Sequence, residues 1–494
     1  MTDAAPNNEL RLFNSLTRKL EPFTPVHAGE ARVYTCGPTV YNYQHIGNMR
    51  AYVFADTLGR TLQWKGYKLT HVVNITDVGH LTSDADEGED KMERMAAREG
   101  KSAWDIARFY QEDFERNLAR LNVQPKQHPR ATEYVDAMIE WGKSIADKHC
   151  YELESGLYFD VATVADYGRL ARAVTEDGEG RIESVEGKRN AADFAIWRKT
   201  PAGEMRQMEW DSPWGRGAPG WHLECSVMGE ALLGFPFDIH TGGIDHREIH
   251  HPNEIAQNQA FCCTNGLDDP KNSGAKIWMH NNFLVERSGK MSKSSGEFLR
   301  LQLLVDKGYH PLAYRMMCLQ AHYRSELEFS WEGLGAALTR LKRMVMVVDK
   351  WREKLKEGRN TPGDSWEYER VTRELVARFD ASVSADLNTA EALTVLEEML
   401  AIKGTAPECI VTAAVRMDTV LGLGLGKETR TDLRIRPVSA TITEAEIETA
   451  LARRREARAA KDFATSDAIR DELGAAGVEV MDGDPLGWEW RLAS

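Results

Sequence analysis

The sequence has no run of about 18 uninterrupted apolar residues, the length that a membrane-spanning helix requires. Cysteine is scarce: only seven stand among 494 residues, an odd number without the regular spacing of a disulfide scaffold. The stretch from Met1 to Glu9 has neither a basic cluster nor an apolar segment, so it is not expected to act as a secretory signal. These absences argue against a helical membrane protein and against a small disulfide-bonded secreted domain. They predict a cytoplasmic protein whose cysteines are free thiols or metal ligands.

Basic residues do not predominate either, because the net charge is −14. This balance excludes indiscriminate binding to nucleic acid, although a local basic face could still hold a structured RNA. Hydrophobic residues make up 42% of the chain and charged residues 28%, which is typical of a soluble protein. The length predicts about three or four domains.

Two short motifs indicate a site for a nucleoside triphosphate. The first runs from Pro38 to Asn48, between an apolar segment at Arg32–Cys36 and an amphipathic helix expected over Gly47–Lys65. A strand–loop–helix opening of this kind places phosphates at a helix N-terminus. The second, Lys290-Met-Ser-Lys-Ser294, is a loop with two lysines that can close on developing phosphate charge.

Further strands predict a Rossmann-type α/β sheet. A β-rich run from Leu69 ends in polar residues, including Thr76, where open α/β sheets place ligand contacts. A second strand enters the turn Gly242-Gly-Ile-Asp245, whose carboxylate suits ribose hydroxyls. The acidic stretch from Asp84 to Asp90 is interpreted as a solvated loop or helix start, with a magnesium role as the alternative.

The sequence pattern divides the chain into five expected regions, with a turn-rich linker over Gly422–Pro437. Between the two halves of the expected sheet, the pattern predicts helices and then short strands. After the second half of the sheet, the pattern is almost wholly helical. The expected regions are a first half of a Rossmann-type catalytic domain (1–130), a connective insertion (131–215), a second half of the catalytic domain (216–325), a helical bundle (326–425) and a small C-terminal α+β module (438–494).

A third group of residues has the chemistry of a metal site. His250 and Glu254 are four residues apart on one face of an expected helix, Cys225 precedes them, and Cys36 ends the first strand. Thiolates, imidazole and carboxylate together suit zinc. Spacing alone also allows a buried cysteine and a surface His–Glu pair, which are individually more common.

The combined motifs resemble those of the cysteinyl-tRNA synthetases, a family of class I aminoacyl-tRNA synthetases. The resemblance runs from about residue 10 to the C-terminus. The matching segments are Cys36-Gly-Pro-Thr-Val-Tyr-Asn42, His45-Ile-Gly-Asn48, Asn74-Ile-Thr-Asp77, Lys188-Arg-Asn190, Asp193-Phe-Ala-Ile-Trp197, Ser212-Pro-Trp-Gly215, Pro219-Gly-Trp-His-Leu-Glu-Cys225, His250-His-Pro-Asn-Glu254, Trp278-Met-His280, Lys290-Met-Ser-Lys-Ser294, His322-Tyr-Arg-Ser325 and the helix from Arg458 to Asp467.

This resemblance implies ATP-dependent transfer of L-cysteine to tRNA(Cys) by a monomer. One zinc ion would select the substrate thiolate, and Mg²⁺ would accompany ATP. The implied zinc ligands are Cys36, Cys225, His250 and Glu254. The implied amino-acid pocket contains Cys36, Thr76 and Trp221. The implied catalytic residues are His45, Asn48, Lys290 and Lys293, and the ATP contacts are Gly37, Thr39, His45, Gly47, Asn48, Gly243, Asp245 and Lys293.

The helical region and the C-terminal module are expected to bind tRNA. Candidates on the helical region are Arg340, Lys342 and Arg343, with an ordinary solvated helix face as the alternative interpretation. The candidates for the anticodon contact are Arg458, Phe463 and Asp467, because an arginine, a ring and a carboxylate can stack with or bond unpaired bases. Trp488 and Trp490 are expected in the core of the module.

One residue departs from the family pattern: Asn48 stands where class I synthetases usually have histidine. Asparagine can donate a hydrogen bond to phosphate but carries no positive charge. Two alternatives to the synthetase remain, and Asn48 bears on the second of them. One is a ligase that joins cysteine to an amino sugar, a family without an anticodon-reading module. The other is an inactive synthetase relic that binds RNA and zinc.

Overall fold

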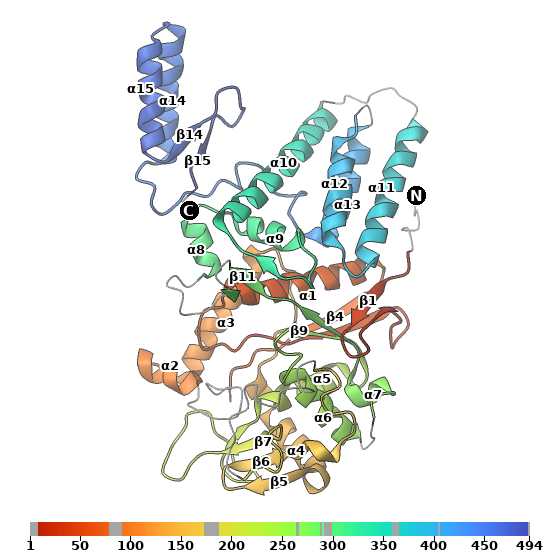
Figure 1. The fold of residues 1–494 in the computed structure, drawn as a ribbon. Helices are drawn as coiled ribbons and strands as arrows, with labels where there is room; N and C mark the ends of the chain where they lie inside the picture. Colours follow the sequence, from red (N-terminus) through yellow and green to blue (C-terminus); the bar gives the residue numbers. More distant parts are fainter. Residues whose placement is uncertain are drawn as a thin grey trace.

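A four-stranded parallel sheet in the order β10-β9-β3-β4 lies at the centre of the molecule (Figure 1). The computed structural model describes residues 8–78, 91–171, 187–262, 266–286, 289–290, 299–357, 365–403 and 406–492. The sheet strands are β3 (Glu30–Thr35), β4 (Lys68–Val73), β9 (Phe237–Gly243) and β10 (Ala275–Asn281). The expected Rossmann-type sheet is confirmed. Its winding reverses between β3 and β9, the point at which open α/β sheets bind ligands.

Helices cover both faces of this sheet. Successive side chains along β3 point to opposite faces, and each face packs against a helix. Val33 packs on one face with Phe54 and Leu58 of α1 (Ile46–Trp64), the helix expected over Gly47–Lys65. Tyr34 points to the other face, where α5 (Trp221–Leu233) approaches closely through Gly229. Figure 1 shows α1 and α5 on opposite sides of the sheet. In this arrangement the N-termini of α1 and α5 lie near the carboxyl ends of the sheet strands.

Short elements and an inserted sheet complete the region around the central sheet. A hairpin of β1 and β2 lies beside β10, and α5 packs against α6. The insertion forms an antiparallel sheet in the order β5-β6-β7-β8, beside α4 at the lower end of Figure 1. The bounds are β1 (Arg11–Asn14), β2 (Lys19–Pro22), α2 (Lys91–Glu99), α3 (Ala103–Arg120), η1 (Ala131–Tyr134), α4 (Val135–His149), β5 (Cys150–Leu153), β6 (Gly156–Phe159), η2 (Val161–Thr163), β7 (Phe194–Lys199), β8 (Gly217–Pro219), α6 (His250–Cys262) and α7 (Pro270–Ser273).

A bundle of helices stands on the α1 side of the sheet (Figure 1). Its elements, with the short strands below them, are β11 (Leu284–Glu286), β12 (Gly289–Lys290), α8 (Leu301–Asp306), α9 (Pro311–Leu319), β13 (Leu327–Glu328), α10 (Trp331–Lys356), α11 (Ser365–Ser384), α12 (Thr389–Ala401) and α13 (Pro407–Leu421). The stretch Gly422–Pro437, expected as a linker, has no regular structure, yet Leu423, Leu425 and Leu433 are fully buried in the main core. It is therefore packed onto the bundle. No helix in the described ranges is both long and apolar enough to cross a membrane.

The C-terminal module is a helical hairpin beside a two-stranded antiparallel sheet. It contains α14 (Glu444–Ala459), α15 (Phe463–Ala475), β14 (Val478–Val480) and β15 (Trp488–Trp490). Trp488 and Trp490 are buried in its core, which confirms their expected packing role. Lys342 of α10 pairs with Glu489 at 2.6 Å, and the Arg434 guanidinium lies 3.6 Å from the centroid of the Trp488 ring. These contacts fix the module on the bundle.

A buried charge network ties α1 to the bundle. Asp56 of α1 is fully buried and pairs with Arg60 at 2.7 Å, Arg315 at 2.8 Å and Lys126 at 3.1 Å. Arg315 lies on α9 and also donates to the carbonyl of Leu421, at the end of α13. One carboxylate therefore joins three segments that are distant in sequence.

Candidate active site and metal centre

The carboxyl ends of the four parallel strands border one cavity of about 370 Å³. The N-terminus of α1 and the first residue of α5 complete its wall. Most of the predicted site residues line this cavity: Cys36, Gly37, Thr39, His45, Gly47, Asn48, Thr76, Trp221, Cys225, Gly243, Asp245 and His250. Residues expected to bind ATP and residues expected to bind a metal therefore share one space.

Among the described side chains predicted for the ATP, amino-acid and metal sites, Glu254 alone does not line the cavity. Glu254 lies behind the wall and is 1% exposed. The backbone of Lys290 belongs to β12, whereas Lys293 lies outside the described residues. The acidic stretch from Asp84 to Asp90 also lies outside them.

The turn after β3 requires glycine at position 37. A Cβ atom on Gly37 would lie 1.4 Å from the carbonyl oxygen of Asn74, so no other residue fits without moving the backbone. The Gly37 amide donates to Asn74 Oδ1 at 2.7 Å. Asn74, part of the predicted polar exit of β4, thus fixes the turn that leads into the first motif.

His45 caps the helix whose N-terminus faces the cavity. Its Nδ1 atom accepts a hydrogen bond from the Gly47 amide at 3.0 Å, so the neutral imidazole carries its proton on Nε2. The helix N-terminus adds a partial positive charge at the same place. Asn48, in the first turn of α1, donates from Nδ2 to Gln44 Oε1 at 3.0 Å. This end of α1 can therefore bind an anion.

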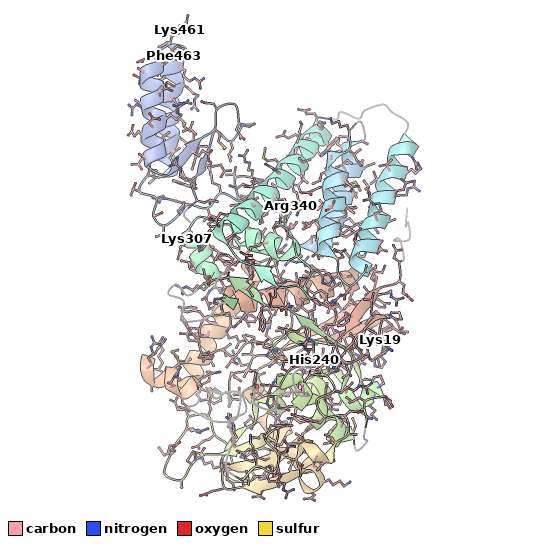
Figure 2. The ribbon with its side chains drawn as sticks, viewed as in Figure 1. Lys19, His240, Lys307, Arg340, Lys461 and Phe463 are labelled. Carbon is pink, nitrogen blue, oxygen red and sulfur yellow. The ribbon has the colours of Figure 1, made fainter. Side chains whose placement is uncertain are left out.

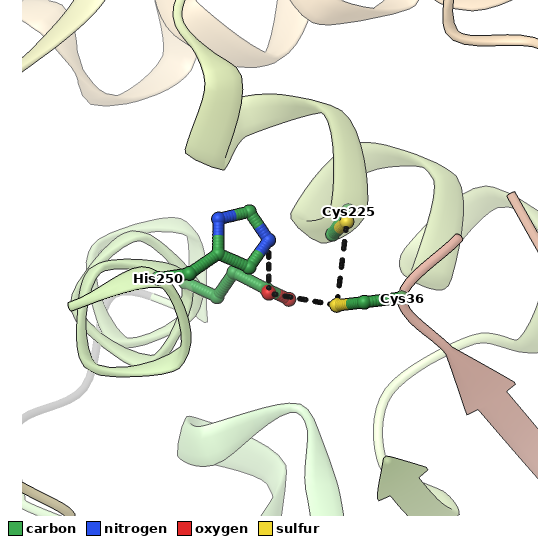
Figure 3. Close-up of side chains that lie close together, drawn as sticks. Cys36, Cys225 and His250 are labelled. Carbon is green, nitrogen blue, oxygen red and sulfur yellow. Dashed lines mark hydrogen bonds and ion pairs between the residues drawn. The ribbon is translucent and has the colours of Figure 1, made fainter. Parts of the chain in front are cut away.

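Two thiols, an imidazole and a carboxylate meet in a buried cluster (Figure 3). The Sγ atoms of Cys36 and Cys225 are 3.9 Å apart, and Cys36 Sγ is 3.8 Å from Glu254 Oε1. His250 Nε2 lies 3.0 Å from the same carboxylate oxygen. All four donor atoms lie within 4.8 Å of one another. The fold therefore brings together the four predicted zinc ligands from α5, α6 and the residue that follows β3.

The charges of this cluster suit a divalent cation. A hydrogen bond from the Cys36 thiol lowers the pKa of Cys225 to about 6, against the opposing effect of burial. Burial and the neighbouring Cys225 raise the pKa of Cys36 well above its usual value. Burial also tends to raise the pKa of Glu254, but His240 and His250 lower that pKa to about 2. One thiolate and one carboxylate thus favour the charged form that metal ligands need. Burial tends to lower the pKa of His250, but Glu254 and Cys225 raise that pKa to about 10, so a bound metal ion would displace the His250 proton.

Surrounding histidines support the cluster, and the sequence motifs did not identify their roles. His222 Nδ1 lies 2.8 Å from His250 Nδ1, and His240 Nε2 lies 2.8 Å from Glu254 Oε2. Partners of this kind orient metal ligands. A second possible group combines Cys36 and Glu254 with His240 and His251, but neither of these two histidines borders the cavity. The predicted set is the one that a ligand in the cavity can reach.

The residues expected to bind tRNA differ in their surroundings. Phe463 is 63% exposed at the outer end of the module, beside Lys461 (Figure 2). Arg458 pairs with Asp482 at 2.8 Å, and Asp467 lies 3.6 Å from Arg470. On α10, Arg340 forms two 2.8 Å bonds to Glu397, so like Lys342 it has a partner within the protein; Arg343 is exposed. Contact of these residues with tRNA stays a prediction.

The sequence matches two protein families over most of its length. Residues 22–339 match the family described as tRNA synthetases class I (C) catalytic domain, and residues 443–491 match the cysteinyl-tRNA ligase anticodon binding domain. A cysteine–tRNA ligase of Novosphingobium aromaticivorans is 72% identical over 99% of this chain and 98% of its own. The chain belongs to the cysteinyl-tRNA synthetase family. A second cysteine–tRNA ligase, from Zymomonas mobilis, is 51% identical over 99% of both chains.

Solved structures agree with this membership at the level of the fold. A methionyl-tRNA synthetase from Mycobacterium tuberculosis, crystallised with methionyl-adenylate, has a TM-score of 0.56 and 14% identity. The match covers 80% of this chain and 93% of that one. The protein is an enzyme by its membership in the cysteinyl-tRNA synthetase family. The class I fold that the sequence predicts is confirmed.

Proposed function

We propose that this enzyme charges tRNA(Cys) with L-cysteine in two steps inside the cavity. In the first step, the cysteine carboxylate attacks the α-phosphorus of ATP bound with Mg²⁺, forming cysteinyl-adenylate and releasing pyrophosphate. In the second, a ribose hydroxyl of the terminal tRNA adenosine takes the cysteinyl group and AMP leaves. One observation carries the proposal: the thiol–imidazole–carboxylate cluster and the His45 helix N-terminus border the same cavity.

The residues on the phosphate side act by position and charge. His45 donates from Nε2 to a phosphate oxygen, and the α1 N-terminus adds its partial positive charge. Lys290 and Lys293 meet the leaving pyrophosphate, and Asp245 binds the ribose hydroxyls. Positioning and charge stabilisation supply most of the rate in such a displacement, so no covalent intermediate with the protein is needed.

The donor set fits zinc, which is held by thiolate, imidazole and carboxylate ligands. Cys36, Cys225, His250 and Glu254 would hold the ion, and bound zinc would take the substrate thiolate as a further ligand. That chemistry separates cysteine from serine, because a hydroxyl ionises far less readily and is a poorer zinc ligand. Trp221 and Thr76 line the cavity beside the cluster and would enclose the amino acid.

Substituting Asn48 by alanine tests its role as a phosphate donor. We expect cysteine activation to fall by roughly 10–100-fold, the value of one hydrogen bond to a charged group. ATP–pyrophosphate exchange at saturating cysteine measures this step. Asn48→Asp is a useful companion, because it keeps the size but replaces the donor with a charge that repels phosphate. If Asn48→Ala exchanges pyrophosphate at the wild-type rate, Asn48 does not bind the phosphates.

Transfer of labelled cysteine to total tRNA, with ATP and Mg²⁺, tests the whole proposal. We expect charging with cysteine and none with serine, carried out by a cytoplasmic monomer. ATP consumption with cysteine and an amino sugar, without tRNA charging, would favour the sugar ligase; the match of residues 443–491 to an anticodon-binding domain argues against it. No turnover with either acceptor would favour a binding relic.

A further inference from the structure

A buried arginine on α1, Arg50, has no role among the residues assigned so far. It is 2% exposed and lies five residues after His45. No carboxylate is among its hydrogen-bond partners in the described part of the chain. Burying a cation without an ion pair is costly, because the cation loses its hydration. Burial accordingly lowers the pKa of Arg50, although a guanidinium stays protonated in proteins.

Four main-chain carbonyls take the place of a carboxylate partner. Nη1 of Arg50 donates to the carbonyl of Asn282 at 2.8 Å and to that of Phe283. Nη2 donates to the carbonyls of His322 at 3.3 Å and Ser325 at 2.6 Å. A planar guanidinium presents its donors in a fixed fork, so one side chain can bond two segments at once. Arg50 therefore joins α1 to two segments that are distant in sequence.

The first of these segments is a wall of the cavity. Residues 282–284, at the junction of β10 and β11, all line the cavity. Leu284 packs on the N-terminus of α1, because a Cβ atom on Gly47 would lie 3.7 Å from the Leu284 Cβ atom. β11 lies beside α1 (Figure 1) and pairs with β12, the strand that contains Lys290. Arg50 thus holds the strand next to Lys290 against the N-terminal part of α1.

The second segment is His322-Tyr-Arg-Ser325, a motif that matches the family but has no assigned role. It forms a turn between α9 and β13. Asn282 donates from its backbone amide to the Tyr323 carbonyl at 2.8 Å and from Nδ2 to the Arg324 carbonyl at 3.0 Å. The Tyr323 hydroxyl donates to Asp386, just after α11, at 2.6 Å. The motif therefore holds the same wall that the guanidinium binds, and it links this wall to the bundle.

We propose that Arg50 is a positioning residue for cysteine activation. By bonding the wall and the turn, it sets the distance between the α1 N-terminus, where phosphates would bind, and the strand pair that contains Lys290. Lys290 would then meet the charge that develops on the leaving pyrophosphate. A displacement of about 1 Å from the productive geometry can lower a rate by about 100-fold. This inference rests on the proposed function, and it adds a residue that acts through others rather than on the substrate.

The kinetic test compares Arg50→Met with wild-type enzyme, because methionine fills the space with an unbranched side chain that has no donor. We expect the kcat of ATP–pyrophosphate exchange per active site to fall about 100-fold. The KM values for ATP and cysteine should stay within about threefold, since the misplaced groups act on charge that develops in the transition state. Transfer from preformed cysteinyl-adenylate to tRNA should also stay within about threefold, because pyrophosphate has already left. A purely structural role would slow both steps equally.

Two further variants separate position from charge and from packing. Arg32→Met is the matched control: Arg32 also donates to main-chain carbonyls, those of Leu233 and Pro236, but lies toward the amino end of β3, away from the cavity. It should leave kcat unchanged. Arg50→Lys keeps the charge without the planar fork, so its kcat should fall about 10-fold, and it replaces Arg50→Met in the comparison if that variant does not fold. Full activity of Arg50→Lys would overturn the positioning role.

Hydrogen–deuterium exchange tests the same link without relying on activity. The amides of residues 282–286 should exchange faster in Arg50→Met than in wild type, whereas Arg32→Met should leave their protection unchanged. Unchanged protection in Arg50→Met, or a wild-type kcat of that variant, would overturn the inference. So would equal slowing of activation and transfer. Absence of pyrophosphate exchange by the wild type would instead contradict the proposed function, and amide protection would still test the link.

Discussion

Replacing Cys225 by serine is expected to abolish the proposed zinc binding. It is also expected to lower the proposed cysteine activation by more than about 100-fold, which exceeds the usual effect of losing a residue that only orients a metal ligand. Serine keeps the shape of the side chain, but its hydroxyl does not ionise at neutral pH, whereas hydrogen bonds from Cys36 and His250 favour the Cys225 thiolate. Zinc content by mass spectrometry and ATP–pyrophosphate exchange measure the two effects on the same preparation.

The matched control for this substitution is Cys409→Ser on α13. Cys409 is a partly buried thiol that belongs to neither possible ligand group, so zinc content and exchange should remain unchanged. Loss of zinc from Cys225→Ser with normal activation would give the ion a structural role only. Retention of zinc would instead favour the deeper group that contains His240 and His251.

The parts of the fold that depend on local pattern could be predicted from the sequence. The 3.6-residue period after Gly47 predicts α1 to within one residue at each end. The apolar segment before Cys36 predicts β3, because buried parallel strands are rich in apolar residues, and the strand expected to enter the Gly242-Gly243 turn is β9. Since carboxyl ends of parallel strands meet at one edge, their polar exits were expected to form one site, and they line one cavity.

The residues around the metal cluster could not be predicted in the same way. Three further histidines, His222, His240 and His251, lie within or beside the motif segments. Their sequence positions alone do not show where the side chains point, since, for example, adjacent residues on a helix point in different directions. Only the packing of α5 against α6 shows that His222 meets His250, and only the position of β9 shows that His240 meets Glu254. These contacts join separate elements, so no local sequence pattern contains them.

The sequence also could not show which basic side chains on the helix surface are paired within the protein. The pattern of α10 predicts a basic helix face, and a helix pattern cannot distinguish a cation that awaits RNA from one paired within the protein. Arg340 pairs with Glu397 of α12, and Lys342 pairs with Glu489 of the C-terminal module. The second pair holds the module on the bundle, so we expect Lys342 to affect tRNA binding through the position of the module.

Substitution of Asp56 by alanine is expected to lower the free energy of unfolding by about 3–5 kcal/mol, because it leaves buried cations without their counter-charge. Arg315 is fully buried and Arg60 nearly so, and both lose their carboxylate partner. Urea denaturation followed by tryptophan fluorescence measures the change. The matched control is Glu140→Ala, which breaks the exposed 2.7 Å pair with Lys143 and should cost less than about 1 kcal/mol.

The pH dependence of the Asp56 network follows from the same charges. Burial tends to raise the pKa of Asp56, but Arg315, Lys126 and Arg60 lower that pKa well below its usual value. The carboxylate therefore stabilises the fold fully at neutral pH, and this contribution is lost as the pH falls below about 4, the pKa of an unfolded aspartate. The wild type should thus lose stability toward acid more steeply than Asp56→Ala. If the two proteins show parallel acid denaturation, the network contributes no net charge stabilisation, and α1 must be held against α9 by apolar packing instead.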